Sequence, residues 1–194
     1  MTPFDMRGRT VVLTGGAGQL GQQWATALGK AGARVHVLDL PGTDVTSVES
    51  MREALGRTGT AWGLVCAAAI DAKPGTAGCG RPEDVPLESF TRAVTVNLIG
   101  VQNTIQVYAK AMIEAGCGSI VLIGSLFGLL GPDHRRYETI LPREGPAFYK
   151  PAAYSASKGG VLALARYWGV YLAPYGVRVN CLVPGSMDRD DYPA

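Results

Sequence analysis

The chain has 194 residues, of which 47% are hydrophobic and 18% are charged, and its formal net charge is +2. With 26 glycines, this composition is typical of one globular domain rich in tight turns, and it excludes a disordered or fibrous chain. No block of Lys or Arg is present, so nucleic acid is not expected as a partner. The longest mostly apolar run, 120–130, is too short to span a bilayer, and we expect no membrane segment.

The cysteines and the N-terminus favour a cytoplasmic protein. Cys66, Cys79, Cys117 and Cys181 show neither metal-ligand spacing nor a CxxC motif, and residues 1–7 lack the apolar core of a secretory signal. The sequence therefore predicts free thiols, no metal site and a cytoplasmic location.

A strand, a glycine-rich turn, a helix and a second strand open the chain. The apolar run 10–14 predicts a buried strand, 19–31 predicts a helix, and 34–39 predicts a parallel strand. Glycines in such a turn let the backbone approach a pyrophosphate, which the helix N-terminus attracts. The turn residues expected to contact a dinucleotide are Gly15, Gly18, Gln19, Leu20 and Gly21.

Asp39 ends the second strand, about where an acid must lie to bind the 2′-hydroxyl of an adenosine ribose. Leu40 and Pro41 follow, so no Lys or Arg is placed there to receive a 2′-phosphate. The sequence favours NAD over NADP as the cofactor. The alternative for Asp39 is an ordinary polar strand end.

Only four residues separate Asp39 from Asp44, too few for the helix that usually follows the second strand of a doubly wound sheet. This crossover is therefore predicted to be abbreviated. Thr46 or Ser47 can cap the next helix, which runs to about residue 57, and 61–69 is predicted to be a buried strand.

The second half of the chain continues the alternation of helices and strands. Apolar residues at helical spacing predict one long helix over 87–115, followed by a buried strand over 119–125. Ser125 stands at the carboxyl end of that strand, where ligands bind in open α/β sheets. The alternative is a serine that only satisfies backbone groups. A last strand is expected over 178–183.

Tyr154 and Lys158 lie four residues apart on a helix predicted to run to Leu172, so their side chains share one face. A free tyrosine has a pKa of about 10, but a neighbouring cation favours the phenolate and makes the group a usable general acid or base. Such a pair alone is a weak signal, and its weight comes from the other motifs. The long connection 126–153 before it is typical of a functional loop, with a solvated loop as the alternative.

Taken in order, the glycine turn 14–21, Asn97, Ser125, Tyr154-x-x-x-Lys158 and 180–185 resemble the short-chain dehydrogenase/reductase family. The resemblance covers nearly the whole chain. It implies one NAD(P)-binding α/β domain over 1–194, with a doubly wound, Rossmann-like parallel sheet in three αβα layers. The abbreviated crossover after the second strand and a missing C-terminal strand are expected departures.

The resemblance also implies roles for single residues. Tyr154 would be the proton donor or acceptor at the substrate oxygen, and Ser125 would hydrogen-bond the same oxygen. Lys158 would bind the nicotinamide ribose and lower the tyrosine pKa, and Asn97 would help to hold a proton-relay water, with a helix kink as the alternative. Further cofactor contacts are implied at Asp44, Val45, Ala67, Ala68, Tyr154, Pro184 and Gly185.

Three features depart from the family pattern. Gln19 occupies the middle glycine position, and the spacing of the turn is similar to that of nucleotide-sugar epimerases. Cys66 to Ala69 replace the usual Asn-Asn-Ala-Gly, so an amide that steadies the turn beside the cofactor is absent. The chain ends soon after Gly185, where relatives continue through a substrate-covering segment, so we expect a C-terminally shortened member with weak NAD binding and little turnover.

The leading hypothesis is an NAD-dependent oxidoreductase acting on a small secondary alcohol or ketone, including sugar derivatives. Segments 131–133 and 149–154 weakly resemble dehydrogenases of sugar and flagellin modification. The alternatives are a nucleotide-sugar epimerase and a cofactor-binding protein without turnover. A homodimer or homotetramer is expected through the helices 87–115 and 152–172, because small residues on the second helix permit close approach; packing within one domain is the alternative.

Overall fold

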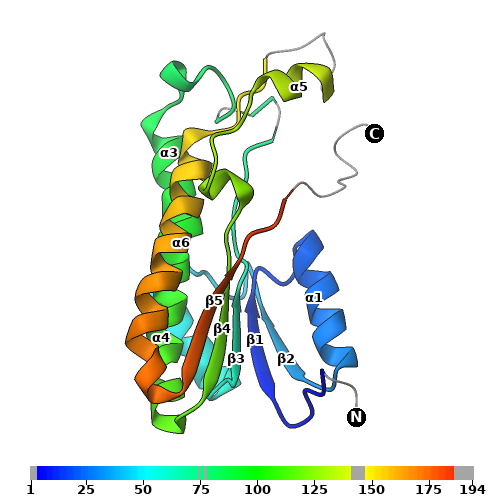
Figure 1. Ribbon diagram of the computed structural model, residues 1–194, viewed down its shortest axis with the longest axis vertical. Helices are drawn as coiled ribbons and strands as arrows, with labels where there is room; N and C mark the ends of the chain where they lie inside the picture. The colour runs from blue at the N-terminus through cyan, green and yellow to red at the C-terminus, as the bar shows by residue number, and fades with distance from the viewer. Residues whose placement is uncertain (1–3, 74, 77, 141–146, 186–194) are drawn as a thin grey trace.

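The computed structural model of the chain describes residues 4–73, 75–76, 78–140 and 147–185 (Figure 1). Its centre is a parallel sheet in the order β2-β1-β3-β4-β5. The strands are β1 (Thr10–Thr14), β2 (Arg34–Leu38), β3 (Gly63–Cys66), β4 (Gly118–Ile123) and β5 (Val177–Leu182). All the predicted strands are present, and their ends differ from the predicted ones by at most three residues.

Helices cover both faces of the sheet. They are α1 (Gln19–Lys30), α2 (Val48–Thr58), α3 (Leu87–Val94), α4 (Gly100–Ala115), α5 (Arg135–Ile140) and α6 (Ala152–Leu172), with 3₁₀ turns at Pro82–Asp84, Leu126–Gly128 and Ala173–Tyr175. Figure 1 shows α1 on one side of the sheet and α4 and α6 on the other. Because α2 packs on α4, it belongs to the second layer. The predicted doubly wound αβα architecture is confirmed.

The abbreviated crossover after β2 is also confirmed. No helix lies between the end of β2 at Leu38 and the start of α2 at Val48. Ser47 caps α2, and its Oγ accepts a hydrogen bond of 3.2 Å from the Ser50 N–H. The chain therefore passes directly from β2 to α2 and β3, which leaves β2 as an edge strand of the sheet.

The segment 87–115 is not one regular α-helix, contrary to the sequence prediction. A π-helical turn, Thr95–Ile99, separates α3 from α4 and contains Asn97. The Asn97 side chain binds both backbone groups of Ile70, accepting from its N–H at 2.8 Å and donating to its C=O at 2.9 Å. These bonds hold the Asn97 side chain against the segment after β3, at the point where the helix widens into a π-helical turn. The helix irregularity that was the alternative explanation for Asn97 is therefore present.

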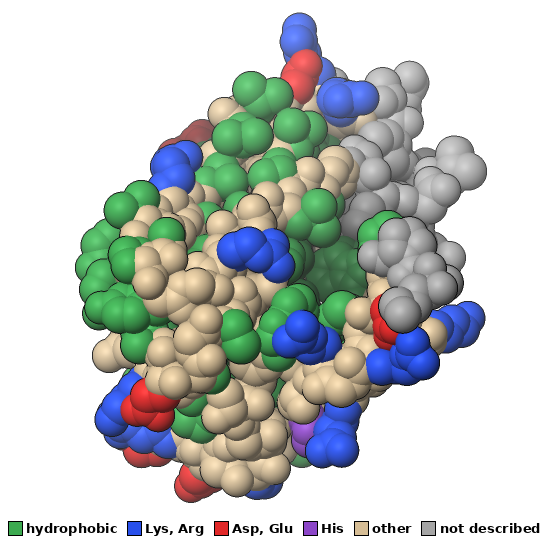
Figure 2. Space-filling view, turned by 60° about the horizontal axis from the view of Figure 1, so that its bottom comes forward, with side chains coloured by type: hydrophobic (Ala, Val, Ile, Leu, Met, Phe, Trp, Pro, Cys, Tyr) green, Lys and Arg blue, Asp and Glu red, His purple; other side chains and the backbone are tan. Residues whose placement is uncertain are grey.

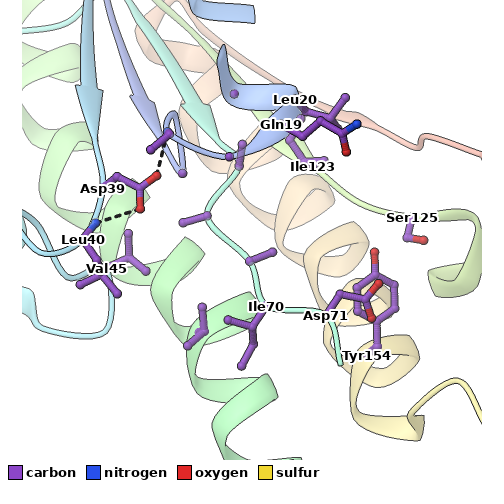
Figure 3. Close-up of a pocket in the computed structure, with 18 of the residues that line it drawn as sticks. Gln19, Leu20, Asp39, Leu40, Val45, Ile70, Asp71, Ile123, Ser125 and Tyr154 are labelled. Carbon is purple, nitrogen blue, oxygen red and sulfur yellow. Dashed lines mark hydrogen bonds between the residues drawn. The ribbon is translucent and has the colours of Figure 1, made fainter. Parts of the chain in front are cut away.

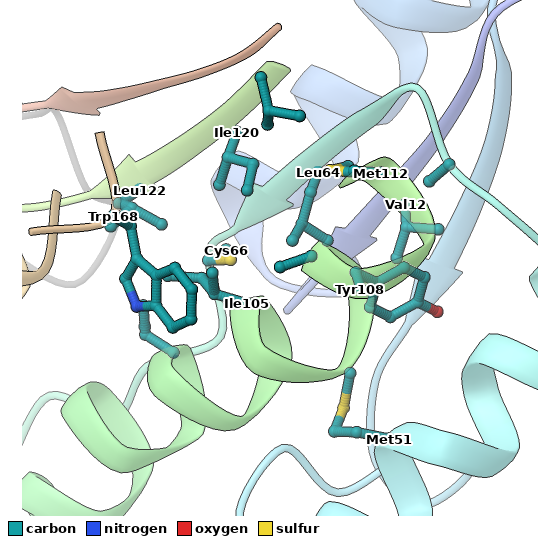
Figure 4. Packing of buried hydrophobic residues seen from close by; sticks show 14 of the residues in the cluster. Val12, Met51, Leu64, Cys66, Ile105, Tyr108, Met112, Ile120, Leu122 and Trp168 are labelled. Atoms are coloured by element: carbon teal, nitrogen blue, oxygen red, sulfur yellow. The ribbon is translucent and has the colours of Figure 1, made fainter. Parts of the chain in front are cut away.

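The main core lies between the sheet and the layer formed by α2, α4 and α6 (Figure 4). Tyr108 and Trp168 can be buried in this core because the polar atom of each side chain has a hydrogen-bond partner. The Tyr108 hydroxyl lies 2.9 Å from Thr58 Oγ1, and Trp168 Nε1 donates to Gln102 Oε1 at 3.0 Å. The fully buried apolar partners include Val12, Met51, Leu64, Ile105, Met112, Ile120 and Leu122.

Small residues of α6 serve packing within the chain. A Cβ at Gly160 would lie 2.7 Å from Leu98 Cδ2, and one at Gly159 would lie 3.4 Å from the Gly128 carbonyl oxygen. Both glycines therefore pack against other parts of the same chain. This packing is the alternative to a subunit interface that the sequence leaves open for the small residues of α6. Ala152, Ala156 and Ala163 remain exposed.

The connection 126–153 is partly structured and is tied to the rest of the fold. The Tyr149 N–H donates to the Cys79 carbonyl at 3.0 Å, and the Lys150 N–H donates to His134 Nδ1 at 3.3 Å. These bonds hold the chain just before α6. The expectations for 141–146 and for the tail after Gly185 lie outside the described residues.

No helix in the described part of the chain combines the length and the apolar character needed to cross a membrane. Within the same residues, no three His, Cys, Asp or Glu side chains gather where they could hold a metal ion. Figure 2 shows one face of the molecule, on which Lys and Arg side chains are scattered among hydrophobic and other side chains, some of them beside Asp or Glu.

The start of α1 predicts opposite effects for two glycine substitutions. Gly21→Ala should destabilise the protein by about 1–3 kcal/mol, because its Cβ would lie 2.5 Å from Gly16 Cα. Gly29→Ala is the matched control in the same helix, since nothing lies within 4 Å of its Cβ position, and it should stabilise by about 0.5–1 kcal/mol. Urea unfolding measures both changes, and equal effects would contradict this account of the turn.

Candidate active site

A cleft of about 1290 Å³ lies at the carboxyl ends of the strands and extends from the glycine turn to α6 (Figure 3). Register explains why distant segments meet there. Thr14 at the end of β1 pairs with Leu38 of β2 on one side and with Cys66 of β3 on the other. The segments after these three strands therefore leave the sheet at the same end, the carboxyl end of the strands, which is where open α/β sheets bind ligands.

The glycine turn forms one end of the cleft. Gly15 has a φ of +70°, and a Cβ there would lie 2.6 Å from the backbone N of Ala68. Gly18 precedes α1 without a side-chain hydrogen bond to cap the helix, so N–H groups of its first turn are available to a ligand. A close-packed turn at an uncapped helix start fits a pyrophosphate. Gln19, Leu20 and Gly21 also line this end.

The Asp39 carboxylate is held over the glycine turn. It accepts hydrogen bonds from the Ala17 N–H and from its own neighbour, the Leu40 N–H, both at 2.8 Å (Figure 3). Asp39 and Leu40 both line the cleft, and the Leu40 side chain is exposed. A fixed carboxylate at this place can accept hydroxyl hydrogen bonds and would repel a phosphate.

The predicted contacts Asp44 and Val45 line the same end of the cleft. Asp44 Oδ1 accepts from both the N–H and the hydroxyl of Thr46 at 2.8 Å. Asn103 of α4 donates from Nδ2 to the carbonyls of Val45 and Thr46, at 3.1 and 3.2 Å. Asn103 has no role in the sequence prediction, because only the fold brings α4 beneath this segment.

Ala67 and Ala68, the cofactor contacts expected after β3, also line the cleft. The Ala67 N–H lies 3.2 Å from both the carbonyl oxygen and Oγ1 of Thr14, and the Ala68 N–H lies 3.4 Å from the same Oγ1. Thr14 is almost completely buried. Its hydroxyl thus steadies the turn for which the expected side-chain amide is absent.

Ser125 and Tyr154 line the other end of the cleft. Ser125 follows β4, and its Oγ accepts a hydrogen bond of 3.2 Å from the Phe127 N–H. Tyr154 projects from the first turn of α6, and in Figure 3 its hydroxyl group points toward Ser125. Gly185 also belongs to the lining, and the Pro184 carbonyl accepts from the Leu126 N–H at 3.1 Å.

Lys158 lies behind Tyr154 rather than in the cleft lining. It is 4% exposed, and its Nζ donates to the Ile123 carbonyl at 2.7 Å. The Nζ lies 5.8 Å from the centroid of the Tyr154 ring. Burial lowers the pKa of Lys158 from 10.5 to about 8, although the nearby Cys181 and Asp71 act in the opposite direction. The expected contact with a ribose stays a prediction.

Asn97 is also completely buried and does not line the cleft. Besides its two bonds to Ile70, its Nδ2 lies 3.3 Å from Ser157 Oγ. Ser157 Oγ in turn donates to the Tyr154 carbonyl at 2.8 Å. Asn97 therefore joins the segment after β3 to the helix that carries Tyr154, and its expected water-holding role stays a prediction.

An ion pair that the sequence did not reveal stands beside Tyr154. Lys150 Nζ lies 2.5 Å from Asp71 Oδ2, and both residues line the cleft. The same Nζ is 4.2 Å from the centroid of the Tyr154 ring, closer than Lys158, and 5.6 Å from that of Phe127. Asp71 and Lys150 are far apart in the chain and belong to no helical repeat, so no spacing rule could pair them.

Comparisons with known proteins agree with this geometry. Residues 3–139 and 143–192 match a family model described as enoyl-(acyl carrier protein) reductase. Secoisolariciresinol dehydrogenase from Forsythia intermedia is 28% identical, over 92% of this chain and 66% of its own length. Cyclohexanol dehydrogenase from Rhodococcus sp. (strain TK6) is 28% identical, over 94% of this chain and 75% of its own length. The chain thus spans about two thirds to three quarters of these relatives.

A solved structure shares the fold. The short-chain dehydrogenase from Leptospira borgpetersenii, solved with bound NAD⁺, has a TM-score of 0.81 and 26% identity, over 96% of this chain and 74% of its own length. The family model covers nearly all of the sequence, and its matched range contains the glycine turn, Ser125, Tyr154 and Lys158. The chain therefore belongs to the short-chain dehydrogenase/reductase family of oxidoreductases, as its ordered motifs predict.

Proposed function

We propose that the protein is an NAD-dependent oxidoreductase that moves hydride between the nicotinamide and a secondary alcohol or ketone. The observation that carries the proposal is the cleft itself. One end offers a glycine turn and the Asp39 carboxylate, which suit a dinucleotide, and the other end offers the hydroxyls of Ser125 and Tyr154. A relative named as an alcohol dehydrogenase and a neighbour solved with NAD⁺ support the same reaction class.

The glycine turn, Asp39, Asp44 and Val45 would hold the adenosine and pyrophosphate, and Ala67 and Ala68 would border the cofactor toward the substrate. Bound NAD would supply or accept the hydride. In the direction of ketone reduction, Tyr154 Oη gives its proton to the substrate oxygen as that oxygen gains negative charge. Ser125 Oγ donates a hydrogen bond to the same oxygen, which stabilises the developing charge.

Lys158 supports this chemistry from behind the ring. A positive charge near Tyr154 favours the phenolate and so makes the proton easier to transfer. Asn97 acts indirectly, by positioning other groups. It binds the backbone of Ile70, next to Asp71, and through Ser157 it holds the first turn of α6, which carries Tyr154.

Two other functions are less well supported. An epimerase would need a nucleotide-sugar pocket, and the relatives described above are named dehydrogenases. A cofactor-binding protein without turnover would have no use for the paired hydroxyls of Ser125 and Tyr154 in the cleft.

We also propose the expected homodimer or homotetramer and a cytoplasmic location. The outer surface of α6 supports the first, since Tyr167, Val170 and Tyr171 are 64%, 79% and 49% exposed and form an apolar stripe. The four free cysteines support a reducing compartment.

Tyr154→Phe removes the proton that the reaction needs and leaves the ring in place. The kcat for alcohol oxidation should fall by about 10²–10⁴-fold. The Kd for NADH, measured by calorimetry, should stay within about twofold, because the cleft loses only one hydroxyl. Tyr175→Phe is the control, since Tyr175 lies in the turn after α6 and outside the cleft lining. Near-native turnover by Tyr154→Phe would refute the assignment.

NADH should bind more tightly than NADPH, by about tenfold or more, because the Asp39 carboxylate would repel a 2′-phosphate. Asp39→Ala should narrow this gap, and titration calorimetry with both dinucleotides measures it. Asp84→Ala, which removes a carboxylate outside the cleft lining, should leave the ratio of the two Kd values unchanged. Tighter binding of NADPH by the native protein would contradict the cofactor preference.

The lowered pKa of Lys158 predicts a pH effect on stability. Between pH 8 and 10.5 the unfolded chain holds a proton on this lysine more often than the folded one, so its contribution to the free energy of unfolding rises with pH. The free energy of unfolding of the native protein should therefore rise relative to that of Lys158→Met across this window, by up to about 3 kcal/mol. Urea unfolding at several pH values tests the slope. A flat or falling difference would show that burial does not depress the pKa.

A further inference from the structure

The ion pair between Asp71 and Lys150 is the strongest feature of the cleft that the reaction described above leaves unused. We propose that this pair is a polar subsite for a second hydroxyl group of the substrate, so the protein prefers vicinal diols, polyols and their ketones to alcohols with one hydroxyl. The inference rests on the proposed function and deepens it by giving the substrate class.

The pair is placed where a substrate must lie. Lys150 Nζ is 4.2 Å from the Tyr154 ring centroid, and Asp71, Lys150, Ser125 and Tyr154 all line the same cleft. Figure 3 shows Asp71 next to the Tyr154 ring on the side of the cleft away from the glycine turn. A substrate whose reacting oxygen meets the Tyr154 hydroxyl therefore has its neighbouring carbons close to the pair.

The pair is built into the fold and is not a solvated surface contact. The Lys150 side chain is 7% exposed, and its ammonium is close to the rings of both Tyr154 and Phe127. Asp71 keeps 24% of its side chain exposed, and because its Oδ1 is buried, the carboxylate oxygen open to a ligand is Oδ2, which Lys150 binds. Exchanging a buried ion pair for apolar residues is often neutral or stabilising, so stability alone is a weak reason for this one.

Both partners are held by independent contacts. Asp71 follows Ile70, whose N–H and C=O are both bound by Asn97. The backbone N–H of Lys150 is bound by His134, and the preceding N–H, of Tyr149, by the Cys79 carbonyl. A subsite held in this way is already formed before the substrate arrives, which lowers the entropic cost of binding.

The chemistry of the pair selects hydroxyl groups. A carboxylate accepts and an ammonium donates hydrogen bonds, so one alcohol hydroxyl can donate to Asp71 and accept from Lys150. Because the two charges of the pair oppose each other, the pair attracts a carboxylate or phosphate on the substrate less strongly than a single lysine would. An apolar ring carbon at the same place would shield the ion pair from water without a compensating bond, which is unfavourable.

The test compares trans-cyclohexane-1,2-diol with cyclohexanol, which differ by one hydroxyl group, with NAD⁺ as the oxidant. The native protein should show a kcat/KM for the diol at least about tenfold above that for cyclohexanol. Asp71→Leu/Lys150→Met removes both charges together and leaves neither one unpaired, and it should bring this ratio close to one. Equal kcat/KM values in the native protein, or an unchanged ratio in the double variant, would overturn the inference.

Glu49→Gln/Arg52→Met is the matched control, because it removes an ion pair on α2 that lies outside the cleft lining. This control should keep the native ratio. Preference for a ring with a carboxylate in place of the second hydroxyl, such as 2-hydroxycyclohexanecarboxylate, would also count against a hydroxyl subsite.

A binding measurement separates failure of this inference from failure of the proposed function. If no alcohol is oxidised, the proposed reaction fails, and the subsite is then judged by saturation-transfer NMR of the diol with the NADH-loaded protein. Diol binding that is lost in the double variant and kept in the α2 control supports the subsite. Equal diol signals in native protein and double variant refute it, and circular dichroism shows whether each variant is folded.

Discussion

The two hydrogen bonds between the Asn97 side chain and the backbone of Ile70 are the contact on which the substrate end of the cleft depends. They join the segment after β3 to the π-helical turn between α3 and α4. A third bond from the same amide reaches Ser157, which binds the Tyr154 carbonyl. One buried side chain thus relates the wall of the cleft that contains Asp71 to the helix that carries the reacting phenol.

The dinucleotide end depends instead on close approach of backbone segments. Gly15 must be glycine because its φ is positive and because Ala68 occupies the place of a Cβ. The small side chains at Ala67 and Ala68 and the buried Thr14 hydroxyl complete this contact. The departure from the family motif after β3 therefore leaves the turn supported, by a hydroxyl from β1 in place of a side-chain amide.

Two lysines approach Tyr154, and their surroundings differ. Lys158 donates to the Ile123 carbonyl, forms no ion pair with a carboxylate among the residues that the structure describes, and has its pKa lowered by burial. Lys150 is nearer to the Tyr154 ring, but its charge is balanced by Asp71, whose Oδ2 lies 2.5 Å from Lys150 Nζ. Because an ion pair largely cancels its own field, Lys158 is the better source of positive charge for the phenol, and Lys150 is the better hydrogen-bond donor at the cleft wall.

The sequence by itself determined the order of strands and helices, the glycine turn, Asp39 and the Tyr154–Lys158 pair, because these are set by local periodicity, by turn chemistry and by short spacings. Only the tertiary structure decided what lies between segments far apart in the chain. The π-helical turn at Asn97, the support of Val45 by Asn103, the Thr14 hydroxyl and the pairing of Asp71 with Lys150 all arise from long-range packing. Such contacts have no fixed spacing, so no pattern along the chain can reveal them.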